Sequence, residues 1–117
     1  MTRLDDMVHA YLACALWTAT DEHGEALDRV HTAEDFHPDT VTAARAECAD
    51  FLQAASEDAA TLPAEQVGHD FWLTRNRHGA GFWDRGLGEQ GRRLTDLAHP
   101  YGGADVYVGD DGFLHIS

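Results

Sequence analysis

The segment from His69 to Gly86 constrains the fold of this chain more than any other. It has the sequence HDFWLTRNRHGAGFWDRG and holds two of the three tryptophans, with three arginines and two histidines, around a Gly-Ala-Gly sequence. Short aromatic runs at 69–75 and 81–85 are separated by turn-forming residues. This pattern predicts a β-hairpin. The rest of the chain must then supply elements that cover such a hairpin.

Two helices are predicted before this segment. Thr2 and Asp5 approximate a capping box, and apolar residues recur at helical spacing after them, which predicts a helix over roughly residues 3–18. Pro38 suits the first position of a second helix that continues to about residue 59. Residues 19–37 lose the periodicity and collect acidic side chains, so we expect a long connection there, with one helical turn around residues 33–36.

A third helix and a second hairpin are predicted after it. The third helix covers residues 87–99 and ends before Pro100, and the Gly-Asp-Asp-Gly sequence at 109–112 lies between two apolar runs, as in a β-hairpin. A chain of 117 residues is the length of one domain. The sequence therefore predicts a single α+β domain over 1–117, with the order α-α-β-β-α-β-β. Both hairpins should join one antiparallel sheet packed against the helices.

Composition excludes several classes of function. There is no lysine, so a Walker-A lysine and a Schiff-base lysine are impossible. The only serines are Ser56 and Ser117, which excludes a G-x-S-x-G hydrolase. Cys14 and Cys48 fall within helical patterns and are expected to be buried thiols. No apolar run is long enough to span a membrane, and residues 1–6 lack the features of a signal peptide, so we expect a cytoplasmic protein in the host cell.

The negative charge is concentrated in the first half of the chain. The net charge is −13, and residues 1–66 hold 14 acidic but only 3 basic side chains. This balance disfavours direct binding of nucleic acid and suits a basic protein partner, including a surface that normally holds nucleic acid. The alternative is that the acidity serves only solubility. The predicted partner-binding residues are Glu47, Asp50, Glu57 and Asp58, as an outward carboxylate ladder on the second helix, with Asp21, Glu22 and Glu25 in the long connection. Trp72 and Trp83 are candidate aromatic anchors.

The alternative to a binding protein is a small enzyme. His69, His78 and Asp84 could converge as a metal- or histidine-dependent hydrolase site, although no H-x-x-x-H or H-E-x-x-H spacing supports one. If these three residues have only a structural role instead, we expect the histidines to form hydrogen bonds within the hairpin and Asp84 to pair with a nearby arginine. A second alternative is an anion site at Gly79–Gly81, beside Arg75 and Arg77. The sequence implies no cofactor and no metal in the favoured interpretation.

Two stretches of the chain carry a resemblance to a known family. The block from His69 to Gly88, HDFWLTRNRHGAGFWDRGLG, and the residues Leu94-Thr95, Ala98, Tyr101-Gly102 and Asp105–Gly112 resemble a family of small proteins from phages and bacterial mobile elements. Arg77 stands where members of this family usually have glycine. The resemblance implies a phage-borne setting and no particular reaction. The combined prediction is a non-catalytic acidic module that inhibits a host nucleic-acid-binding protein, as anti-CRISPR or anti-restriction proteins that mimic DNA charge do.

Overall fold

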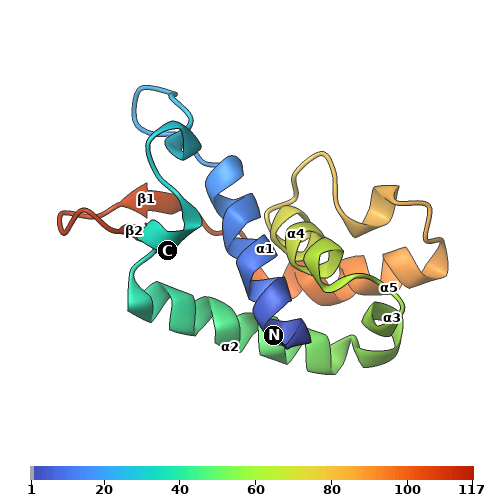
Figure 1. The fold of residues 1–117 in the computed structure, drawn as a ribbon. Helices are drawn as coiled ribbons and strands as arrows, with labels where there is room; N and C mark the ends of the chain where they lie inside the picture. Colours follow the sequence, from blue (N-terminus) through green and yellow to red (C-terminus); the bar gives the residue numbers. More distant parts are fainter. Residues whose placement is uncertain (1) are drawn as a thin grey trace.

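Two helices, α1 (Arg3–Trp17) and α4 (Ala64–Arg75), form the centre of the molecule and share its most extensive helix–helix contact. The computed structural model describes residues 2–117, and Figure 1 shows α1 and α4 with α2 (Pro38–Ala54) crossing beneath them. Gly68 permits the close approach of α1 and α4, because a Cβ atom there would lie 2.2 Å from the Met7 carbonyl oxygen.

The three helices predicted from periodicity are present. The Thr2–Asp5 capping box begins α1, and Pro38 is the first residue of α2, as expected. The second predicted helix breaks at Ala55, after which α3 (Ser56–Ala60) turns the chain toward α4. The third predicted helix is α5 (Glu89–Ala98). The expected helical turn in the long connection is the 3-10 helix η2 (Ala33–Asp35), which follows η1 (Leu27–Arg29).

The predicted aromatic hairpin was wrong. Residues 69–75 are the second half of α4, and residues 81–85 form a loop that contains the 3-10 helix η3 (Phe82–Asp84). Nearly every residue of α4 after Gln66 is buried, so the helix lacks the polar face that makes a helical pattern visible in a sequence. The aromatic residues Phe71 and Trp72 pack in the core as helix residues rather than as strand residues.

The turn signal after Arg75 ends this helix. The Arg77 N–H donates to the Thr74 carbonyl, and the His78 N–H donates to the Leu73 carbonyl, which is the hydrogen-bond pattern of a Schellman motif. Arg77 has a φ of 55°, in the left-handed region that this motif requires and that glycine adopts most easily.

The only sheet among residues 2–117 is the final hairpin. Strands β1 (Val106–Val108) and β2 (Leu114–Ile116) pair antiparallel, with Tyr107 opposite His115, as the Asp-Gly turn predicted. The His37 N–H donates to the Leu114 carbonyl and ties this hairpin to the start of α2. The fold is thus a mixed helical domain with one small antiparallel sheet. The predicted order α-α-β-β-α-β-β was wrong because its first β pair is a helix and a loop.

The elements enclose one hydrophobic core. Phe51 stacks on Phe71 and Phe82, with ring centroids 4.3 and 5.7 Å apart, so the loop after α4 contributes to the same core as α2. Both cysteines are buried, and burial raises the pKa of each thiol to about 12. None of the helices in residues 2–117 combines the length and apolar character needed to cross a bilayer. The 3-10 helix η4 (His99–Tyr101) leads from α5 to the hairpin.

Candidate functional site

Arg75 shows that much of the His69–Gly86 segment holds the fold together. Its guanidinium donates to the Tyr11 hydroxyl, to the Glu47 carboxylate and to the carbonyl oxygens of Tyr101 and Gly102, over 2.8–3.0 Å. It thereby joins α4 to α1, α2 and the segment after α5. Because this side chain is directed into the protein, it does not lie beside Gly79–Gly81 to bind an anion there.

Asp70 has a similar structural role. Its carboxylate is fully buried and accepts three hydrogen bonds of 2.8–3.2 Å from the Arg85 guanidinium. The interaction with Asp70 raises the pKa of Arg85. Asp84 accepts a hydrogen bond from the Gly81 N–H within its own loop. These contacts fix the path of the loop after α4, and Asp84 does not line the cavity that His69 and His78 share.

The two tryptophans of this segment have different environments. Trp72 is 2% exposed, and its indole N–H donates to the Thr18 hydroxyl, so it is a core residue and does not serve as a surface anchor. Trp83 is 55% exposed and remains available to a partner. Trp17, at the end of α1, is 60% exposed and stacks on His69. The sequence pointed to Trp83 but missed Trp17, which lies outside the aromatic segment.

A groove runs between α1, α4 and the loop after α4. Two adjoining cavities of about 640 and 520 Å³ share Trp17, His69 and Arg85 as lining residues. His78 borders the second cavity, so the structure does bring His69 and His78 to one place. Asp84 is not part of either wall. Among residues 2–117, no group of three or more His, Cys, Asp or Glu side chains is arranged to hold a metal ion.

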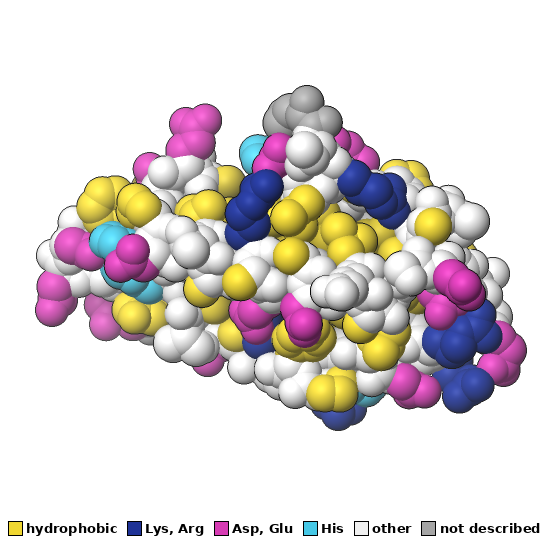
Figure 2. All heavy atoms as spheres, turned by 90° about the horizontal axis from the view of Figure 1, so that it is seen from below, with side chains coloured by type: hydrophobic (Ala, Val, Ile, Leu, Met, Phe, Trp, Pro, Cys, Tyr) yellow, Lys and Arg dark blue, Asp and Glu magenta, His cyan; other side chains and the backbone are white. Residues whose placement is uncertain are grey.

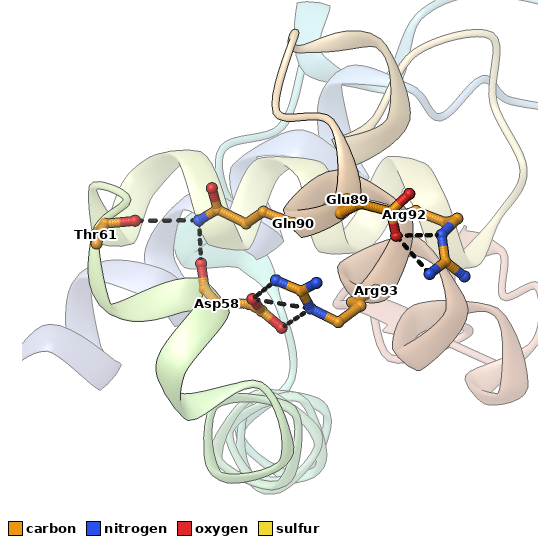
Figure 3. Close-up of polar contacts among 6 residues, drawn as sticks. All are labelled: Asp58, Thr61, Glu89, Gln90, Arg92 and Arg93. Carbon is orange, nitrogen blue, oxygen red and sulfur yellow. Dashed lines mark hydrogen bonds and ion pairs between the residues drawn. The ribbon is translucent and has the colours of Figure 1, made fainter.

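The carboxylates predicted on the second helix already have partners within the molecule. Glu47 pairs with Arg75, and Asp50 accepts a hydrogen bond from the Tyr101 hydroxyl. Asp58 pairs with Arg93 of α5 at 2.7 Å, and its backbone carbonyl accepts a hydrogen bond from Gln90 (Figure 3). This pairing lowers the pKa of Asp58. Only Glu57 of these four is exposed without a partner among residues 2–117.

The expected ladder of free carboxylates along α2 is therefore not formed. The exposed positions of this helix carry mostly alanine, threonine and glutamine, and in Figure 2, which views the molecule from below, the few acidic groups near the middle lie among uncharged atoms. Other acidic side chains lie toward the end of the molecule that carries β1 and β2 (left in Figure 1), and Figure 2 shows acidic, histidine and hydrophobic side chains together at its left.

We call this region the acidic end and define it as residues 20–39 with residues 105–111. The two stretches lie together because Thr20, Asp21 and Glu22 share a cavity wall with β1, and because Phe36 bridges to Leu114. One arginine, Arg29, is the only basic residue besides histidine in these two stretches. The acidic end contains ten carboxylates: Asp21, Glu22, Glu25, Asp28, Glu34, Asp35, Asp39, Asp105, Asp110 and Asp111.

Hydrogen bonds to several of these carboxylates hold the loops in place and keep them charged. Asp21 accepts from the backbone N–H groups of Glu25 and His23, and these bonds lower its pKa. The pKa of Asp35 is lowered by the Thr32 N–H and then by the His31 ring. These hydrogen bonds therefore hold the loops in a defined conformation and favour the ionised form of their carboxylates.

Exposed apolar side chains lie among these carboxylates. Val30, Tyr107, Val108 and Phe113 are the large hydrophobic residues most exposed to solvent here, and Tyr107 and Val108 are 46% and 43% exposed. Apolar contacts surrounded by charged groups are the usual composition of a protein-binding surface. Sequence patterns identified Asp21, Glu22 and Glu25, but they could not show that the hairpin acids lie beside them.

Comparisons of the chain with protein-family models, with curated proteins and with solved structures found no match.

Proposed function

We propose that this protein is a non-catalytic binding module that docks its acidic end on a basic surface of another protein. The observation that carries the proposal is the gathering of ten carboxylates and one arginine around exposed apolar side chains. Of the eight arginines, six pair with carboxylates within the molecule: Arg29, Arg45, Arg75, Arg85, Arg92 and Arg93. Five of these six lie outside the acidic end, so the negative charge there is left largely uncompensated.

The chemistry of such a surface favours a partner that normally holds nucleic acid. Nucleic-acid-binding sites concentrate arginine and lysine to neutralise phosphates, and clustered carboxylates can occupy the same cations. Opposite charge also accelerates the encounter of two proteins. Given the resemblance to phage and mobile-element proteins, the partner is a host protein of defence or nucleic-acid metabolism, and the module inhibits it by competing with the nucleic acid.

The hydrolase alternative has less support. His69 and His78 border one cavity, but Asp84 is engaged with the backbone of its own loop and does not line that cavity. A zinc-dependent hydrolase needs three protein ligands around one ion. His69 stacks on Trp17, an arrangement that serves packing or partner contact as well as chemistry.

Capture of partners from host extract tests the proposal. The protein is immobilised at low salt, bound host proteins are eluted with a salt gradient, and each is assayed for nucleic-acid binding with and without the module. We expect one partner to elute at moderate salt and to release its nucleic acid when the module is added. A partner that binds nucleic acid and the module simultaneously would contradict the proposed competition.

A further inference from the structure

Strand β1 has an unpaired edge. In the hairpin, hydrogen-bonded pairs form at Asp105 with Ser117 and at Gly109 with Phe113, so Tyr107 directs its N–H and C=O toward β2. By the same alternation, the N–H and C=O groups of Val106 and Val108 point away from β2. These four backbone groups have no hydrogen-bond partner among residues 2–117. The edge of β2, by contrast, is met by Phe36 and His37.

A cleft runs beside this edge. Its volume is about 320 Å³, and it is lined by all three residues of β1 on one side and by Thr20, Asp21, Glu22 and Leu27 on the other. That volume corresponds to about ten water molecules. The unpaired groups of β1 thus lie beside a space between two parts of the acidic end, and no backbone hydrogen bond from the facing residues 20–27 closes this edge.

We propose that the cleft receives an extended basic segment of the partner, which adds to the open edge of β1 as a third strand. This inference rests on the proposed function, because it takes the partner to be basic. Strand addition would satisfy the four free backbone groups of Val106 and Val108. Asp21 and Glu22 across the cleft, with Asp105 and Asp110 at the ends of β1, would pair with arginine or lysine side chains of that segment.

Charge selects this occupant over a second copy of the chain. Two β1 edges paired with each other would bring the acidic ends of two molecules together, and like charges placed opposite one another destabilise strand pairing. A basic strand would instead place positive charges beside the carboxylates of the acidic end, and opposite charges stabilise strand pairing. The short length of β1 limits the addition to two outward-facing residues, so side-chain charge has to supply much of the affinity.

A synthetic peptide tests the inference on the intact protein. The probe is the hexapeptide Arg-Val-Arg-Val-Arg-Val, and its control is the same peptide N-methylated at every residue, which keeps the charge but loses all strand donors. We expect the methylated peptide to bind at least about tenfold more weakly, since the hydrogen bonds lost contribute roughly 1 kcal/mol each. Amide exchange of the protein should slow at Val106 and Val108 and stay unchanged at Tyr107, which is already bonded to β2.

The outcomes separate the two proposals. Equal affinity of both peptides, or unchanged exchange at Val106 and Val108 on binding, would overturn the strand addition. Absence of any binding by the unmethylated peptide would overturn it as well. The proposed function is judged by the capture experiment, which makes no use of this edge. If a captured partner binds without protecting these two amides, the proposed function holds and the proposed strand addition is wrong.

Discussion

Replacing Arg75 with methionine should destabilise the domain strongly. The side chain is 5% exposed, and its loss leaves the buried Tyr11 hydroxyl and two main-chain carbonyls without their donor. Removing one partner of a buried ion pair costs about 3–5 kcal/mol. The Glu47 side chain is 38% exposed and can regain water, so we expect the lower value, about 3 kcal/mol.

Denaturant and thermal unfolding measure this loss. A domain of this size has a total stability of roughly 10 kcal/mol, and about 3 kcal/mol corresponds to a decrease in Tm of ~12 °C. The matched control is Arg77→Met, which removes the same charge two residues away from an exposed side chain. The control should unfold within about 2 °C of the wild type on the same scale. Equal Tm values for the two variants would refute the structural role of Arg75.

Three further predictions concern the fold. Gly68→Ala should cost about 1–3 kcal/mol or more, since its Cβ atom would meet the backbone of α1, while Gly79→Ala, with nothing within 4 Å, should be nearly neutral in the same unfolding assay. The two cysteine thiols should resist a thiol reagent in the native protein and react on unfolding, because burial raises their pKa values to about 12. Arg45 and, to a smaller extent, Thr2 lower the pKa of Asp5 to about 2. The stabilisation is therefore complete above the unfolded pKa near ~4 and is lost as pH falls toward 2, so Asp5→Asn should lower Tm at neutral pH but not below pH 2.

Sequence patterns predicted the elements that have one solvent-exposed face and one buried face. The periodicity of α1, the Pro38 start of α2 and the Asp-Gly hairpin are local features, and each appears where it was expected. The helix α4 was missed because its aromatic residues suggested strands. Helical spacing is present in α4, at Ala64, Val67, Gly68, Phe71, Trp72 and Arg75. The residues between them are mostly buried as well from Val67 on, so this spacing does not form a distinct stripe.

The candidate site was only partly predictable. The acidic character of Asp21, Glu22 and Glu25 follows from the sequence alone, whereas the pairing of Glu47 with Arg75 joins residues 28 positions apart. Whether a carboxylate is free or paired depends on tertiary contacts that no periodicity encodes. The same holds for the approach of residues 105–111 to the loop before α2, which creates the acidic end.

Two matched triple variants test whether the acidic end is the binding surface. One replaces Glu22, Asp28 and Glu34 of the acidic end with their amides, and the other does the same to three exposed acids elsewhere, Glu57, Glu65 and Asp96. Both change the net charge of −13 by the same amount. The measurement is the affinity and association rate of each variant for the partner captured from host extract, at low and at moderate salt.

We expect the acidic-end variant to bind about tenfold or more weakly than the wild type, mainly through slower association, and its loss of affinity to shrink as salt screens the charges over ~8–10 Å. The control variant should bind nearly as well as the wild type. Equal losses in the two variants would mean that overall charge, and not this surface, governs binding. No loss in either variant would contradict the acidic end as the binding surface.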